Sequence, residues 1–266
     1  MTKLYEKCLV EMVQSAINQA TPQAQAGSRK GRSTRDQMLK VIILQKFFES
    51  RSRPLPILLV DVRACFDKMV LDDVIFDTIE SGANLRATRA LRKFSNKTII
   101  KLRGDDRNGG EGFGREITNT LGQGSNYAPP GIGLTTSKSL NQEFVGTEHI
   151  MAMLGNIVAD PQSYVDDIAT MLMDENGLRE ACPRISQALE ESSLRSHPDK
   201  TEVVISGRSK KAEMVRENVE SDPPLMQGNP VKVAAAGMYL GMKISQSGHR
   251  DTGLQIVYTA PKRSYV

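Results

Sequence analysis

Hydrophobic and polar residues follow two spacings along this chain, one helical and one extended. The helical spacing predicts helices over residues 3–20, from a Ser33–Asp36 cap to before Pro54, from about Leu71 to a stop at Gly82, and around residues 178–189. The extended pattern predicts strands at residues 57–62, on either side of 166–167, at 203–206 and at 238–244.

Two stretches have no regular pattern. Residues 104–133 are rich in glycine and include Pro129 and Pro130. This composition predicts a long loop or a strand pair with a wide turn rather than a packed helix. Residues 208–230 are polar and predict an exposed excursion. The order of elements predicts an α+β fold with helices on one face of a small antiparallel sheet, whose other face can stay open.

Acidic residues stand at the ends of two predicted strands. Asp61 follows the apolar run Ile57–Val60, and Asp166 and Asp167 lie in the sequence Tyr-Val-Asp-Asp-Ile. A carboxylate on a buried strand costs stability unless a cation pairs with it, so these positions suggest a divalent metal between the strands. Nucleotidyl transfer needs such a site. Other Asp-Asp pairs in the chain stand at a predicted helix start and in a polar loop, so the strand context carries the prediction.

The bulk composition is that of a globular protein. The chain has 266 residues, 39% hydrophobic and 25% charged, which suits one large or two small domains with a hydrophobic core. No stretch approaches the roughly 20 apolar residues of a membrane span, and charged residues near the start exclude a signal-peptide core. We therefore expect a soluble intracellular protein without a membrane partner, in the nucleus or the cytoplasm. The spacing of the three cysteines and three histidines suggests neither disulfides nor a zinc site.

Positive charge gathers in two stretches around the first acid, although the net charge is only +4. Basic stretches that flank an acidic centre fit a polyanion that cations grip and that reacts at metals, and the open sheet face is where a duplex would lie. Two solvated helix faces are the alternative. The first stretch holds Arg29, Lys30, Arg32, Arg35, Lys40, Lys46, Arg51 and Arg53, and the second holds Arg86, Arg89, Arg92, Lys93, Lys97, Lys101, Arg103 and Arg107.

Six segments occur in the order of known polymerase motifs. They resemble the fingers and palm motifs of reverse transcriptases, most closely those of non-LTR retrotransposons and group II introns, and together they span about residues 25–245. The segments are Gln25–Thr34 with Asp36, Asp61–Asp67, Leu121–Ser125 with Ala128-Pro129, Tyr164–Asp167, Pro198–Glu202 and Tyr239–Gly241.

The resemblance implies an RNA-directed DNA polymerase domain of a retroelement, which extends a primer 3′-hydroxyl by two-metal nucleotidyl transfer. It implies two Mg²⁺ ions, with Mn²⁺ as a substitute, held by Asp61 and Asp166, with the Val62 carbonyl as an extra ligand and Asp167 as a weaker partner. It also implies an RNA template, a DNA primer or heteroduplex, and dNTPs, and it leaves the oligomeric state open. In the alternative interpretation, the acids are turn residues of a non-catalytic domain.

The same resemblance gives roles to residues around the nucleotide. Phe66 would be a steric gate that rejects a 2′-hydroxyl, and Gln123 and Gly124 would contact the incoming nucleotide and the template. Without the resemblance, Phe66 is better explained as a core aromatic and Gln123-Gly124 as part of a flexible loop. Lys200 would protonate pyrophosphate or pair with its charge, although a lysine on a strand edge is usually only solvated.

Phosphate and primer contacts complete the implied site. Arg29, Lys30 and Arg32 would approach the triphosphate or the template phosphates from the fingers. Tyr239, Leu240 and Gly241 would form the primer grip, or else only a buried strand.

The resemblance also divides the chain into partial fingers at 1–56, a palm at 57–245 with a fingers-like insertion at about 84–120, and a tail at 246–266 that leads toward a thumb. Measured against the family, the chain begins within the fingers and ends about 20 residues after the primer grip. We therefore expect no thumb, endonuclease, RNase H or zinc-knuckle region in it. A piece of a polyprotein, a truncated element copy and one subunit of several all stay open.

Three positions and one segment depart from the family pattern. Ser28 replaces a usual aromatic residue, Ala128 a serine and His197 an asparagine. Residues 130–139 stand where the family has an apolar helix, and glycine and proline each oppose a helix by roughly 1–3 kcal/mol. We therefore expect the floor of the nucleotide site to be reshaped there.

Two rival functions stay open. A catalytically silent palm-like module that binds RNA is disfavoured by the intact acids and favoured by the altered segment after Gln123. An RNA-templated RNA polymerase is disfavoured by Phe66, because such an enzyme would be expected to have a small polar group near that position.

Overall fold

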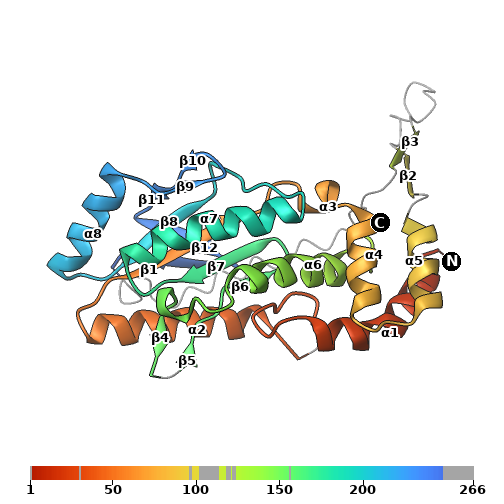
Figure 1. Cartoon of the computed structure of the whole chain (residues 1–266), viewed down its shortest axis with the longest axis horizontal. Helices are drawn as coiled ribbons and strands as arrows, with labels where there is room; N and C mark the ends of the chain where they lie inside the picture. Colours follow the sequence, from red (N-terminus) through yellow and green to blue (C-terminus); the bar gives the residue numbers. More distant parts are fainter. Residues whose placement is uncertain are drawn as a thin grey trace, which may run out of the picture.

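The computed structural model describes residues 2–29, 31–95, 98–101, 114–117, 121, 124–155 and 157–247. Its centre is a five-stranded sheet in the order β11-β8-β1-β7-β6 (Figure 1). The strands are β1 (Leu55–Asp61), β6 (Gln162–Tyr164), β7 (Asp167–Met171), β8 (Glu202–Ser206) and β11 (Lys232–Val233). Neighbouring strands are antiparallel except β11, which lies parallel to β8 at one edge. The predicted α+β fold is confirmed, with one parallel edge strand added.

Helices and four small strand pairs complete the described fold. The α-helices are α1 (Thr2–Ala20), α2 (Thr34–Ser50), α3 (Cys65–Lys68), α4 (Leu71–Glu80), α5 (Leu85–Ser95), α6 (Ala128–Glu143), α7 (Glu175–Glu191) and α8 (Lys210–Ser221), with a 3-10 turn at Glu148–Ile150. The pairs are β2 (Thr98–Lys101) with β3 (Gly114–Ile117), β4 (Met153–Leu154) with β5 (Ile157–Val158), β9 (Leu225–Met226) with β10 (Asn229–Pro230), and β12 (Ala236–Tyr239) with β13 (Met242–Ser245). Within the described ranges, none of the helices has the length and apolarity needed to cross a membrane.

The sheet is covered on both faces, with α2 on one side and α7 on the other (Figure 1). Leu58 and Val60 of β1 belong to a core with residues of α1, α4, α6 and α7. Ile57 and Leu59 belong to a second core with residues of α2 and the β12–β13 hairpin. Burial on both sides explains why the apolar run of β1 does not alternate. The expectation of an open second face is therefore wrong over most of the sheet, and the accessible part is the end that carries Asp61.

Helix α6 corrects the expectation of an irregular segment around residues 128–139. Pro129 and Pro130 lie in its first turn, where a missing backbone N–H breaks no helical hydrogen bond. Gly131 allows α6 to approach α4 closely, because a Cβ atom at this position would lie 2.5 Å from Val74 Cγ1. Tertiary packing therefore stabilises a helix that the intrinsic propensities of its residues disfavour.

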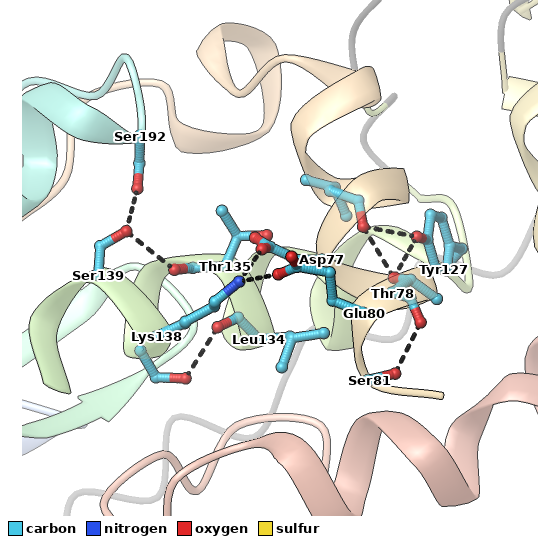
Figure 2. A network of polar contacts seen from close by, with 12 residues as sticks. Asp77, Thr78, Glu80, Ser81, Tyr127, Leu134, Thr135, Lys138, Ser139 and Ser192 are labelled. Atoms are coloured by element: carbon cyan, nitrogen blue, oxygen red, sulfur yellow. Dashed lines mark hydrogen bonds and ion pairs between the residues drawn. The ribbon is translucent and has the colours of Figure 1, made fainter. Parts of the chain in front are cut away.

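Polar side chains fasten α6 to its neighbours on two sides (Figure 2). Lys138 Nζ lies 2.7 Å from Asp77 Oδ1 and 2.5 Å from Glu80 Oε2, and both carboxylates belong to α4. On another side, Ser139 Oγ lies 3.0 Å from Ser192 Oγ, at the end of α7. Polar residues that made the segment look unlike a packed helix thus serve as cross-links between helices.

Two further segments differ from their predictions. Residues 208–230 include α8, whose Ala212, Val215 and Val219 are buried, so this segment is not only an exposed excursion. Residues 238–244 form a hairpin instead of one strand, because Leu240 (φ +51°) and Gly241 (φ +82°) reverse the chain between β12 and β13.

Candidate active site

The sheet brings the predicted acids together at one end. Asp61, the last residue of β1, pairs directly with Asp167, the first residue of β7. Opposite residues in an antiparallel pair have Cα atoms about 4.5–5.5 Å apart and side chains on the same face. Asp166 precedes Asp167, and its carbonyl accepts a hydrogen bond from the Val62 N–H at 3.3 Å. The backbone pairing therefore places three acids from two distant parts of the sequence beside one another.

The turn that carries Asp166 has an unusual backbone. Tyr164 pairs with Asp167, so Val165 and Asp166 form a two-residue loop between β6 and β7. Val165 has a φ of +62°. This left-handed conformation costs an ordinary L-residue about 1–2 kcal/mol, and more is expected for a β-branched one. Such strain persists where the surrounding structure imposes it, and it is frequent at functional sites.

The acids carry more negative charge than their surroundings balance. Burial, followed by the charges of Asp166 and Asp61, raises the pKa of Asp167 to about 6. Burial, with a smaller contribution from Asp61, also raises the pKa of Asp166. Lys200 forms an ion pair with the first of these acids, since its Nζ lies 3.2 Å from Asp61 Oδ2. One exposed lysine cannot neutralise three carboxylates.

Carboxylates are the ligands that hard divalent cations such as Mg²⁺ prefer, so the donor set fits such an ion. In the part of the chain that the structure describes, however, no three Asp, Glu, His or Cys side chains lie close enough together to hold a metal ion as they stand. Lys200 instead supplies the positive charge beside Asp61. The strand pairing sets Asp61 opposite Asp167, so these two carboxylates are the ones that would hold such an ion.

A cavity of about 340 Å³ opens beside the acids. Its lining includes Glu202, which ends one of the six motif segments but received no role from the sequence, and which lies opposite Leu59 in the β1–β8 register. Burial raises the pKa of Glu202, and the hairpin passes so close that a Cβ at Gly237 would lie 2.5 Å from Glu202 Oε1. The sequence contains a signal for this position, because Glu202, like Asp61, adjoins an apolar run that predicts a buried strand. The polar and large side chains of the lining include Asp61, Asp167, Lys200, Glu202, Met238 and Tyr239.

Comparison with known proteins agrees with this geometry. The sequence model of a family described as "Reverse transcriptase (RNA-dependent DNA polymerase)" matches residues 1–244. The chain belongs to the reverse transcriptase family. The comparison with curated proteins gave no match.

Solved telomerase structures share the fold of this reverse transcriptase chain. Apo telomerase from Candida tropicalis matches with a TM-score of 0.60 at 10% identity over 91% of this chain and 39% of that one. A form truncated from its C-terminal domain gives 0.58 at 8% identity, over 90% and 43%. The Candida tropicalis complex with a TWJ fragment of telomeric RNA gives 0.59 at 10% identity, over 90% and 36%. At these identities the likeness shows the fold, and the chain spans less than half the length of each structure.

Backbone hydrogen bonds fix Asp61 and Lys200 of this reverse transcriptase domain beside each other. The His197 N–H donates to the Asp61 carbonyl at 2.8 Å, and the Lys200 N–H donates to the His197 carbonyl at 3.1 Å. The departure from the family pattern at His197 therefore leaves this backbone link in place. His197 Nδ1 is buried and makes no hydrogen bond within the described residues.

The other residues predicted for the nucleotide and primer lie at different distances from the acids. Tyr239 lines the cavity and is 2% exposed, and burial, followed by the charge of Asp167, raises the pKa of its hydroxyl. Leu240 and Gly241 form the hairpin turn next to it. Phe66 lies on α3, half-buried against the main core, and is not among the cavity residues.

The predicted phosphate-binding residues differ in what they contact. The Arg29 guanidinium donates to the carbonyls of Asn18 at 2.9 Å and Pro22 at 2.7 Å, so it caps the end of α1. A phosphate contact would require these bonds to break. Arg32 donates to Gln23 Oε1 at 3.0 Å on the surface. Gly124 is exposed with a φ of +86°, whereas Lys30 and Gln123 lie outside the described residues.

Loss of the Asp167 charge is expected to stabilise the metal-free protein. The folded-state pKa of Asp167, about 6, lies above the ordinary value of 3.8. The unfolding free energy therefore falls as the pH rises between these two values, and it stays lower at higher pH. Asp167→Asn should therefore raise the melting temperature in EDTA at pH 7.5, by several degrees, and the gain should vanish near pH 3.5. Asp73→Asn, on the exposed side of α4, is the control. A lower melting temperature for Asp167→Asn in EDTA would contradict the electrostatic assignment.

Proposed function

We propose that this chain is the polymerase domain of an RNA-directed DNA polymerase that extends a primer 3′-hydroxyl with dNTPs. The observation that carries the proposal is the pairing of Asp61 with Asp167 beside a cavity that also receives Lys200. Membership of the reverse transcriptase family supports the reaction class. The assignment to a retroelement of the non-LTR or group II type rests on the order of the sequence motifs alone.

In this proposal, Asp61, Asp166 and Asp167 hold two divalent ions, Mg²⁺ or in its place Mn²⁺, with the Val62 carbonyl as a further ligand. Reverse transcriptase domains generally use divalent ions, which when bound neutralise the triphosphate and activate the attacking hydroxyl. Lys200 then leaves Asp61 and pairs with the charge of the departing pyrophosphate. Its exposed side chain can make this movement without disturbing the core.

The remaining residues position the substrates. In this proposal Phe66 lies beneath the sugar of the incoming dNTP as a steric gate, and Gln123 and Gly124 contact the incoming nucleotide and the template. The β12–β13 turn at Tyr239, Leu240 and Gly241 holds the primer end next to the acids.

An RNA template and a DNA primer are proposed as the polymer partners. The structurally similar telomerase from Candida tropicalis was solved in complex with a TWJ fragment of telomeric RNA, which supports RNA for this chain by analogy of fold. Arg32 is free to rotate from Gln23 toward a phosphate, and Lys30 is its sequence neighbour. Arg29 is less suited to bind a phosphate, because its guanidinium caps α1.

We also propose the division into fingers, palm and tail, with one adjustment. The palm begins at Leu55 rather than residue 57, since β1 starts there. Residues 84–120 include α5, which packs against α1, in line with a fingers-like insertion. Residues 1–54 and this insertion would then form the partial fingers, and residues 246–266 would lead out of the palm.

Primer extension tests the proposed function. The protein is expected to extend a DNA primer on an RNA template with dNTPs in Mg²⁺ or Mn²⁺, and to stop in EDTA. Extension with rNTPs at a comparable kcat/KM would support an RNA polymerase instead. Binding of the RNA without any extension by folded protein would support the silent RNA-binding module.

Phe66→Ala is expected to relax the choice between dNTP and rNTP. Removing the ring opens space for a 2′-hydroxyl, so the ratio of kcat/KM for dTTP to that for UTP should fall by about 10-fold or more. Single-nucleotide incorporation measures both values. Phe76→Ala removes an exposed phenylalanine of α4, 60% exposed, and should leave the ratio unchanged. An unchanged ratio in folded Phe66→Ala would show that Phe66 is not the residue that excludes the 2′-hydroxyl.

A further inference from the structure

The side chain of Gln25 connects three parts of the chain that are far apart in sequence. It is 0% exposed. Its Oε1 accepts hydrogen bonds from the N–H groups of Gly27 at 2.8 Å and Val165 at 3.2 Å. Its Nε2 donates to the carbonyl of Gly133 in α6 at 3.4 Å. One amide group thus joins the predicted fingers motif, the turn before the paired aspartates and α6.

The backbone around Gln25 lies against the same turn. The Ser163 N–H donates to the Ala24 carbonyl at 3.2 Å, and the Ala26 N–H donates to the Ser163 carbonyl at 3.0 Å. This parallel bridge places residues 24–26 beside β6. Gly27 closes over the turn so tightly that a Cβ there would lie 2.6 Å from Val165 Cγ2 and 2.8 Å from Val165 N. The segment is fitted to the left-handed conformation of Val165.

The hydrogen bond between Gln25 and Val165 involves the residue whose backbone conformation sets the direction of Asp166 and Asp167. Val165 has a φ of +62°, and Asp166 follows it directly. Gly27 and Gly133 hold the Gln25 amide in place, and its oxygen accepts the hydrogen bond from the Val165 N–H. This contact favours the left-handed conformation of Val165, which β-branched residues otherwise avoid. Relaxation of Val165 would change the direction in which Asp166 leaves the turn, and with it the alignment of Asp167 against Asp61.

We propose that Gln25 is a positioning residue for the aspartates of the catalytic turn, an inference that rests on the proposed function. Gln25 touches neither substrate nor metal. It sets the geometry of Asp166 and Asp167 through the Val165 N–H, and through Gly133 it couples this geometry to α6. A glutamine that only fills the core would affect stability without changing the affinity of the site for a cation.

The test compares Gln25→Met with Gln45→Met. Methionine keeps the length of the side chain and removes its amide. Gln45 is a matched control, since it is 5% exposed and its Nε2 donates to Ser206 Oγ at 3.1 Å, at the opposite end of β1 from Asp61. Three quantities are measured: the Mn²⁺ dissociation constant by electron paramagnetic resonance, hydrogen exchange of peptides covering residues 164–168, and kcat and KM for dNTP incorporation.

Gln25→Met is expected to weaken Mn²⁺ binding and to lower kcat by about 10- to 100-fold each, the range typical for residues that orient metal ligands. Exchange over residues 164–168 should accelerate by about 10-fold or more, and KM for dNTP should change by less than about 3-fold. Gln45→Met should match the wild type in all three. Equal Mn²⁺ affinity and equal exchange in the two variants would overturn the proposal.

Gly27→Ala is a second test variant, to be used if Gln25→Met does not fold. Its Cβ would lie 2.8 Å from Val165 N and 3.0 Å from Gln25 Oε1. It would therefore push the two apart without removing the amide, and it should also weaken Mn²⁺ binding by about 10-fold. Wild-type Mn²⁺ affinity in folded Gly27→Ala would count against the proposal. If the wild type incorporates no nucleotide but the Mn²⁺ and exchange effects appear, the proposed function fails and the positioning role stands. Normal incorporation by Gln25→Met refutes the positioning role alone.

Discussion

Asp61→Asn and Asp166→Asn are each expected to reduce primer extension by at least about 100- to 1,000-fold. The two residues come from different strands, and the register sets Asp61 against Asp167 next to Asp166. Asparagine keeps the shape of the side chain and removes the charge that a divalent ion needs. Single-turnover extension on an RNA template with Mg²⁺ measures the loss, and circular dichroism checks that each variant is folded.

Asp73→Asn is the matched control, because it removes one of two adjacent aspartates at an exposed helical position and should retain wild-type extension. The loss in the site variants should appear in kcat, since the ions act on the reacting groups. Extension that survives in Asp61→Asn or Asp166→Asn would refute the assignment of these residues as metal ligands, while leaving the family and the fold unaffected.

Glu6→Leu is expected to destabilise the protein by about 2–4 kcal/mol. Glu6 of α1 is 2% exposed. Its Oε1 accepts hydrogen bonds from Ser125 Oγ at 2.5 Å and the Tyr127 N–H at 3.3 Å, and its Oε2 accepts one from Asn126 Nδ2 at 3.2 Å. The carboxylate therefore satisfies donors at the N-terminus of α6, where the helix dipole also favours negative charge. Leucine would leave these donors without their partner.

Urea denaturation measures this effect as a shift of the midpoint at constant slope. Glu6→Gln keeps an acceptor oxygen and should lose clearly less stability than Glu6→Leu. Glu11→Leu, at an exposed position of the same helix, should change stability by less than about 0.5 kcal/mol. Equal losses for Glu6→Leu and Glu11→Leu would show that the contacts at the start of α6 contribute nothing.

The sequence by itself determined most of the local structure and the position of the acids. The Ser33 cap of α2 forms with reciprocal bonds to Asp36, because capping depends on residues within one turn. Asp61 ends β1 and Asp167 begins β7, because an apolar run followed by an acid marks the point where a buried strand reaches solvent. Six motifs in order gave the family, which a match over residues 1–244 shows.

The tertiary structure decided which of these residues act together. Helix α6 includes Gly131 because α4 packs so closely that a Cβ there would lie 2.5 Å from Val74 Cγ1, and no local propensity reports such a contact. The same holds for Arg29, whose basic charge suggested a phosphate ligand but whose guanidinium caps α1.

Gln25 begins the first of the six motif segments, but its residue type indicated no role, since glutamine side chains are mostly exposed. Its contacts reach across 140 residues to Val165. Contacts between residues so distant along the chain depend on how the whole chain packs, and local propensity, spacing and charge carry no information about them. The identity of the acids can therefore be predicted from the sequence, whereas packing decided what holds them in place.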